Sequence, residues 1–179
     1  MSTALVLLSD THLPKRAKDL PPELWADIDA ADLVVHAGDW VDLATVDLLE
    51  ARSRDLLAVR GNNDLGFEER LPLVATRRIE SLRFAVVHET GASTGRERRA
   101  EADHPDVDVL VFGHSHIPWD STAPNGMRLL NPGSPTDRRR QPDHTWMRCE
   151  VDGSDLSVTL VRRAPGADGI RLVASPEAS

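Results

Sequence analysis

The chain has 179 residues, enough for one domain with a hydrophobic core, and its formal net charge is −8 at pH 7. This acidic balance repels polyanions, so long nucleic acids and anionic membrane surfaces are disfavoured as partners. Cys149 is the only cysteine, which excludes an intrachain disulfide, and the apolar stretch near the N-terminus is far too short to cross a bilayer, so we expect a cytoplasmic protein.

The first third of the chain alternates between apolar strands and helix-like segments. The segments 4–8, 33–36 and 56–59, which are apolar except for His36, predict strands that are buried on both faces. Between them, 21–31 opens with two prolines, as a helix can, and 42–51 carries apolar residues at helical spacing. This alternation is typical of a largely parallel sheet with helices on its faces.

The rest of the chain is mostly β-like, apart from a short arginine-rich helix expected at 96–102. The predicted strands are 77–79, 82–88, 107–112, 119–122, 127–130, 145–151 and 156–162. Asn-Gly and Asp-Gly pairs at 125–126 and 152–153 predict hairpin turns. We predict one domain over residues 1–163, followed by a tail over 164–179 that is rich in Ala, Gly, Pro and Ser and is expected to be loosely ordered.

Five of the apolar strands end in a polar cluster. The clusters are Asp10-Thr11-His12, Gly38-Asp39, Gly61-Asn62-Asn63-Asp64, His88-Glu89 and Gly113-His114-Ser115-His116. Ligands of open α/β sheets bind beyond the carboxyl ends of the strands, so these clusters are expected to converge. In the first and last clusters the candidate ligands are two residues apart, and on an extended backbone they would point to the same side.

The candidate ligands are imidazole, carboxylate and amide groups, without a thiolate. This set suits Mn, Fe, Zn or Ni better than a structural zinc site built on cysteine. Seven such ligands are too many for one tetrahedral ion but fit two ions that share a bridging carboxylate. The seven candidates are Asp10, His12, Asp39, Asn62, His88, His114 and His116. Two ions about 3.5–4 Å apart can clamp the attacking and leaving oxygens of an in-line phosphoryl transfer, with a hydroxide between them as the nucleophile.

The motifs D-T-H, G-D, G-N-N-D, V-H-E, G-H-S-H and N-P-G-S, from Asp10 to about Arg140, resemble the calcineurin-like metallophosphoesterase superfamily. Within it, the chain is most similar to small single-domain bacterial and archaeal phosphodiesterases, a branch related to the retromer scaffold subunit. The resemblance implies an α/β fold, a four-layer αββα sandwich with two divalent metal ions, for which Mn is expected and Fe, Zn or Ni are alternatives. The metal ligands that it implies are Asp10, His12 and His116 for one ion, Asn62, His88 and His114 for the other, and Asp39 as the bridge.

The resemblance also suggests catalytic residues beyond the ligand set. Besides Asp39, Asn62 and His88, our candidates are Asp64, which we expect to brace the Asn62 loop, and Arg139, which could grip a phosphate or belong to a solvated face. Many family members have a histidine after the metal-binding asparagine, thought to protonate the leaving group, and here that position is Asn63. Members of this branch also often have glycine where this chain has Glu89.

We therefore predict a metal-dependent phosphodiesterase that hydrolyses a small phosphodiester. The alternative is a non-catalytic or weakly catalytic protein-binding scaffold of the same fold, which would be free to lose the ligands that are all present here. A nuclease is a third hypothesis, against which the acidic charge counts. The natural substrate, the native metals and the oligomeric state stay open, with a homo-oligomer among the options.

Overall fold

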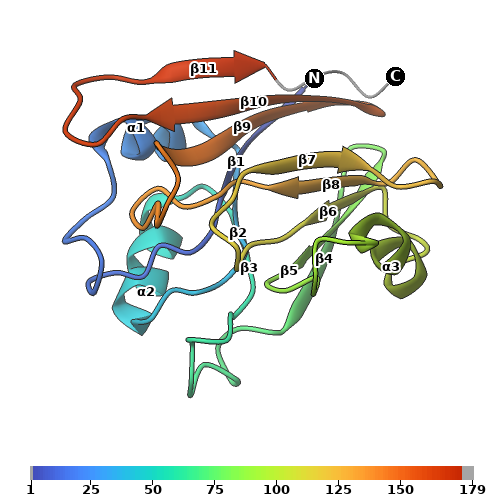
Figure 1. Ribbon diagram of the computed structural model, residues 1–179, viewed down its shortest axis with the longest axis horizontal. Coiled ribbons are helices and arrows are strands. Elements are labelled where there is room, and N and C mark those ends of the chain that lie inside the picture. The colour runs from blue at the N-terminus through green and yellow to red at the C-terminus, as the bar shows by residue number, and fades with distance from the viewer. Residues whose placement is uncertain (1, 175–179) are drawn as a thin grey trace.

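The computed structural model describes residues 2–174. They form two β-sheets that pack face to face, with helices on both outer faces (Figure 1). This is the four-layer αββα sandwich that the sequence resemblance implies, and the fold prediction is confirmed. None of the helices in the described part of the chain is long and apolar enough to cross a membrane.

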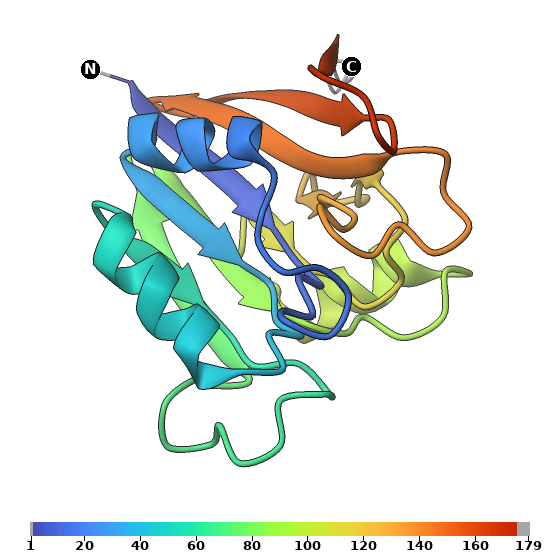
Figure 2. The same cartoon turned by 90° about the vertical axis from the view of Figure 1, so that its left-hand side faces the viewer.

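The first sheet contains the three strands of the predicted strand–helix alternation, and the two helices connect these strands along the chain. Its strands β1, β2 and β3 are parallel, and the sheet continues beyond β1 with antiparallel neighbours. In spatial order the strands are β11 (Arg171–Ala174), β10 (Asp155–Arg163), β9 (His144–Asp152), β1 (Thr3–Leu8), β2 (Leu33–His36) and β3 (Leu56–Ala58). Helices α1 (Pro22–Ala30) and α2 (Leu43–Arg52) cover the outer face of its parallel half, as the blue and cyan helices of Figure 2 show.

The second sheet contains the strands from the middle of the chain and carries one helix, α3 (Arg96–Asp103). In spatial order the strands are β4 (Val74–Ile79), β5 (Leu82–Val87), β6 (Val109–Val111), β8 (Arg128–Asn131) and β7 (Trp119–Thr122). Strands β5, β6 and β8 are parallel, while β4 and β7 run antiparallel at the two edges. Each sheet thus has three parallel strands, and the loops at their carboxyl ends can come together between the two sheets.

The central strands are apolar throughout because both of their faces are buried. In β1, Leu5 and Leu7 face the core between the sheets, while Val6 and Leu8 pack against the helices. Burying one such side chain contributes about 1.5–3 kcal/mol relative to leaving it exposed. Cys149 lies in the same inter-sheet core, and burial raises the pKa of its thiol, in keeping with an inert packing residue.

The expectation of a loosely ordered tail after residue 163 is wrong for Arg171–Ala174. These four residues form β11, which pairs antiparallel with β10 at the edge of the first sheet. Their side chains are exposed, so the pairing rests on backbone hydrogen bonds, which composition does not reveal. Residues 175–179 of the predicted tail lie outside the described residues.

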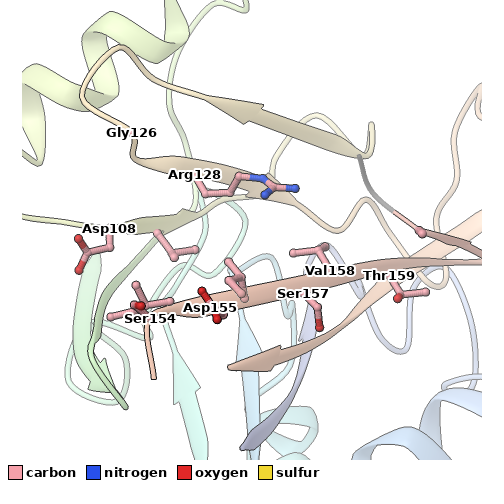
Figure 3. A pocket seen from close by; sticks show the side chains of 12 residues that line it. Asp108, Gly126, Arg128, Ser154, Asp155, Ser157, Val158 and Thr159 are labelled. Atoms are coloured by element: carbon pink, nitrogen blue, oxygen red, sulfur yellow. The ribbon is translucent and has the colours of Figure 1, made fainter. Parts of the chain in front are cut away.

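A cleft of about 780 Å³ opens between the sheets far from the polar clusters (Figure 3). Its lining includes the first residues of β5 and β6, Leu82 and Val109, whereas the clusters follow the last residues of these strands. At this cleft the Arg128 guanidinium forms a two-pronged ion pair with Asp120. None of the predicted ligands lines the cleft, so the functional site lies at the other end of the strands.

Candidate metal centre

The five polar clusters meet where the carboxyl ends of strands from both sheets come together. They follow β1, β2 and β3 of the first sheet and β5 and β6 of the second. Six of the seven side chains belong to overlapping groups whose nitrogen and oxygen atoms could hold a cation, and the amide oxygen of Asn62 contacts two of these histidines. The structure thus brings together Asp10, His12, Asp39, Asn62, His88, His114 and His116.

Asp10, His12 and His116 form a first group of buried ligand atoms. The Nε2 atoms of His12 and His116 lie 3.3 Å apart, and His116 Nε2 lies 3.3 Å from Asp10 Oδ1. His116 Nδ1 donates to the carbonyl oxygen of Asp137, so its Nε2 carries the lone pair of the neutral ring. Burial lowers the pKa of His12 despite the nearby carboxylates, which favours a neutral ring there too. Three lone pairs therefore face one another.

Asn62, His88 and His114 form a second group. The Asn62 amide oxygen lies 3.1 Å from His88 Nε2 and 3.0 Å from His114 Nδ1. His88 Nδ1 donates to the carbonyl oxygen of Ala37 at 2.7 Å, so its Nε2 is the atom left to bind a proton or a metal. Glu89 lies at the open side of this group, with its carboxylate 3.6 Å from His114.

The carboxylate of Asp39 connects the two groups. Its Oδ2 lies 3.5 Å from His12 Nε2, and its Oδ1 lies 3.3 Å from His88 Nε2. Asn63 holds it from the other side, donating its backbone N–H to Oδ1 at 3.0 Å and its side-chain amide to Oδ2 at 2.6 Å. Burial alone would raise the pKa of Asp39, but these hydrogen bonds and His88 outweigh it and hold the pKa well below its usual range.

The donor set fits divalent cations. Asp10 Oδ1 is buried and has no hydrogen-bond partner among residues 2–174, which is costly for a carboxylate oxygen unless a cation is nearby. Imidazole nitrogens and carboxylate or amide oxygens suit Mn, Fe, Zn or Ni. The first group could hold one ion and the second another, with Asp39 in reach of both.

The proton on His88 gives the second group a testable pH dependence. Burial opposes its imidazolium, but the Asp39 hydrogen bond and the charges of Asp10 and Asp39 prevail and raise the pKa of His88 to about 9. A metal at Nε2 must displace that proton, so affinity is expected to rise by up to about tenfold per pH unit below pH 9 and to level off above it. Calorimetric Mn titrations in buffers of different ionisation enthalpy would measure the proton release. A pH-independent affinity between pH 7 and 9 would contradict this assignment.

The backbone at the ligands differs from the extended geometry expected from their spacing. Asp10 and His12 have φ angles of 56° and 45°, and Asp39, His114 and His116 also lie in the left-handed region. Residues other than glycine adopt this region at a cost of about 1–3 kcal/mol each, and such strain gathers at functional sites. The paired ligands are therefore brought together by tight left-handed turns at the strand ends.

Two glycines of the motifs are explained by close approach of the chain. A Cβ atom on Gly61 would lie 2.2 Å from Asp39 Oδ1, and one on Gly113 would lie 2.0 Å from Ser9 Oγ. Neither glycine has a positive φ angle, so the backbone conformation itself does not require glycine at these positions. The absence of a side chain lets the Asn62 and His114 loops pack directly against the Asp39 and Asp10 loops.

Asp64 supports the ligand loops without reaching the ligands' side chains. Its carboxylate is 1% exposed and accepts four backbone N–H groups. The donors and distances are Asp39 at 2.9 Å, Trp40 at 2.7 Å, Val41 at 2.8 Å and Gly61 at 2.7 Å. The bracing role expected for Asp64 is thus what the geometry supports, and it is a positioning residue.

His36 also has a supporting role. Its Nδ1 accepts the Gly38 N–H at 3.1 Å, so its Nε2–H is free to donate to Thr11 Oγ1, 3.1 Å away. The ring is fully buried and stacks on Trp40, with 3.4 Å between ring centroids. Burial lowers the pKa of His36 well below its ordinary value, so a neutral ring links the loops of Asp10 and Asp39.

Sequence reasoning missed several contacts around the centre. Ser134 and Thr136 donate their hydroxyls to the carbonyl oxygens of Asp10 and Thr11, at 2.7 and 2.6 Å. A pocket of about 410 Å³ beside the second group is lined by apolar Leu73 as well as by ligand residues, and no motif pointed to it. Arg139 is exposed and forms no ion pair with the described residues, so its predicted phosphate contact stays a prediction.

Known proteins match this chain in sequence and in fold. A family model for the calcineurin-like phosphoesterase superfamily domain matches residues 4–154. A probable metallophosphoesterase of Methanothermobacter thermautotrophicus is 32% identical over 158 residues, which cover 87% of this chain and 90% of that protein. Another, from Methanocaldococcus jannaschii, is 34% identical over 133 residues, covering 73% and 67% of the two chains. The crystal structure of Chaetomium thermophilum Vps29 matches with a TM-score of 0.83 and 26% identity, covering 97% of this chain and 93% of Vps29.

The range matched by the family model contains all seven candidate ligands and the loop from Asn131 to Ser134. The match and the fold agree with the order of motifs from which the resemblance was drawn. The chain belongs to the calcineurin-like phosphoesterase superfamily.

Proposed function

We propose that this protein is a metal-dependent phosphodiesterase whose centre holds two divalent metal ions, with Mn as the expected metal. One observation carries the proposal: six lone-pair donors gather around Asp39, and one of them, Asp10 Oδ1, is buried without a hydrogen-bond partner among the described residues. Such an arrangement is costly unless cations occupy it. The probable metallophosphoesterases that the chain resembles support a phosphoester as the substrate.

The chain's own residues would divide the work. When bound, the two ions would supply Lewis-acid activation of a water nucleophile and of the phosphoryl oxygens. Asp10, His12 and His116 would hold one ion, Asn62, His88 and His114 the other, and Asp39 would bridge them. Asn63 fixes the Asp39 carboxylate, and Arg139 would contact the substrate phosphate. The apolar Leu73 side of the neighbouring pocket suits the alcohol of a small organic diester.

A metal panel on purified protein tests this function. Chelator-stripped protein should be inactive on bis(p-nitrophenyl) phosphate and should regain activity with Mn, with Fe, Zn, Ni and Mg compared separately. p-Nitrophenyl phosphate, a monoester, should be turned over more slowly. His114→Ala should lower the activity while the variant remains folded like the unaltered protein, because it removes a ligand of the second group. Absence of metal-dependent turnover of either ester would refute the proposal.

The amide at position 63 predicts a preference for good leaving groups. The Asn63 side chain donates to Asp39 and has no proton to give to a leaving alkoxide. General acid catalysis is typically worth 10²–10⁴-fold, so the rate should fall steeply across aryl and alkyl diesters as the leaving-group pKa rises. Asn63→His should make this dependence shallower. A shallow dependence in the unaltered protein would mean that another acid acts, with His104 at the neighbouring pocket the first to test.

The similarity in fold to Vps29 is compatible with a second function, a weakly catalytic or non-catalytic protein-binding scaffold. The complete ligand set favours the enzyme, since a scaffold would tolerate the loss of ligands. Metal-dependent turnover that disappears in His114→Ala would decide for the enzyme. For either function we propose a cytoplasmic location, with which the single buried, unpaired cysteine is consistent.

A further inference from the structure

Two cationic segments border the first group of ligands. Although the chain has a net charge of −8, both of its lysines and four of its arginines fall within residues 15–18 and 138–140. These residues are all exposed or half-exposed. We call them the basic rim: Lys15, Arg16, Lys18, Arg138, Arg139 and Arg140.

Hydrogen bonds attach both segments of the rim to histidines of the metal centre. The backbone N–H of Arg16 donates to the carbonyl oxygen of His12 at 3.0 Å, which closes a turn directly after that ligand. On the other segment, the carbonyl of Asp137 accepts from His116 Nδ1, and the three arginines follow at once. A salt bridge of 3.3 Å between Arg16 and Asp137 joins the two segments. The rim is thus built against the centre and not merely close to it in sequence.

The charge of the rim is largely uncompensated. Among residues 2–174, no carboxylate lies within ion-pair distance of Lys15, Lys18 or Arg140, whereas some arginines elsewhere, such as Arg52, pair with aspartate or glutamate. The acidic residues of the same loops are already engaged, since Asp143 lies 2.9 Å from Arg171. Unpaired cations beside a catalytic centre attract an anion by long-range electrostatics.

The opposite side of the centre has the reverse character. Glu89 stands beside the second group, and the pocket there has apolar Leu73 in its lining. A substrate with an extra anionic group would therefore be oriented with that group toward the rim. The remaining acidic surface would repel a long polyanion, which limits the ligand to a short one.

We propose that the basic rim binds a second phosphate group of the substrate, so that the preferred substrate is a small phosphodiester carrying a further phosphate on one side. This inference rests on the proposed phosphodiesterase function for the scissile bond, but the rim itself can be tested by binding. The same chemistry could come from a phosphorylated small molecule or from the end of a short oligonucleotide. Arg139, proposed for the scissile phosphate, is left unaltered in the test.

The test measures binding of thymidine 3′,5′-bisphosphate and thymidine 5′-phosphate to the Mn-loaded protein by calorimetry. We expect the bisphosphate to bind more tightly, and the preference to fall by roughly threefold for each rim charge removed, as for exposed ion pairs. The variants are Lys15→Gln with Lys18→Gln, and Arg140→Gln. Arg98→Gln, an exposed arginine on α3 away from the rim, is the matched control and should keep the preference. Raising the salt concentration should weaken the preference in the unaltered protein.

Equal binding of the two ligands, or a preference that survives in the rim variants, would overturn the inference. A 5′-phosphorylated thymidine dinucleotide that binds more tightly than the bisphosphate would identify an oligonucleotide end as the source, and weaker binding would identify a small molecule. Turnover of the p-nitrophenyl ester of thymidine 5′-phosphate is measured separately. If neither it nor its 3′-phosphorylated form is hydrolysed while the binding preference persists, the proposed function fails and the rim remains an anion site.

Discussion

Asp39→Asn is expected to lower metal-dependent phosphodiester turnover on the order of 10³-fold, the largest effect on activity of any single change. The carboxylate connects both ligand groups, and its Oδ1 and Oδ2 lie within 3.5 Å of His88 and His12, respectively. An amide of the same shape keeps one weak oxygen ligand and turns an N–H donor toward one of the histidines. Turnover of bis(p-nitrophenyl) phosphate would measure the loss of activity. The metal content after dialysis, determined by mass spectrometry, would measure the loss of bound metal.

Asp106→Asn is a matched control, because Asp106 is exposed and lies outside the metal centre. It should retain full activity and full metal content. If Asp39→Asn kept two equivalents of metal and near-normal turnover, Asp39 could not be the bridging group. The two-ion assignment of the centre would then have to be abandoned.

Asp64→Asn is expected to reduce the free energy of unfolding by about 3 kcal/mol or more, the largest expected effect on stability. The buried Asp64 carboxylate accepts four backbone N–H groups, from Asp39, Trp40, Val41 and Gly61. An asparagine offers a single acceptor oxygen, and its amide group would point at N–H donors that have no water to turn to. Urea unfolding in the presence of chelator measures this loss independently of metal.

The matched control for this stability effect is Asp29→Asn. Asp29 forms a two-pronged ion pair with Arg52, but it lies on the surface, where water replaces the lost contact. Its substitution should change the unfolding transition far less than Asp64→Asn does. A similar shift for both variants would show that Asp64 does not organise the ligand loops.

Much of the fold follows from patterns along the chain. The segments 4–8, 33–36 and 56–59 are apolar except for His36 because the strands are buried between a second sheet and a layer of helices. This signal predicts the strands nearly to their ends. Strand β11 has no such signal, because all of its side chains are exposed and it pairs with β10 through its backbone. An element held by main-chain hydrogen bonds at a sheet edge leaves little trace in composition.

The candidate site likewise has features that the sequence predicts and features that depend on tertiary contacts. Residue types and order predicted which side chains would gather, and the structure brings all seven together. The spacing argument assumed extended strands, whereas Asp10 and His12 have left-handed backbones, which tertiary contacts impose against local preference. Likewise, three of the four hydrogen bonds of Asp64 reach Asp39, Trp40 and Val41, which lie 25, 24 and 23 residues away, and no local sequence pattern predicts such contacts.

The ligands come from both sheets, with Asp10, Asp39 and Asn62 on one and His88 and His116 on the other. Bound cations would therefore link the two β-sheets, and the separation of the cations would depend on the distance between the sheets. Bulk added or removed at Leu7 or Phe84, deep in the inter-sheet core, would alter that spacing without touching any ligand. Catalytic rate in this fold is thus open to tuning from its hydrophobic interior.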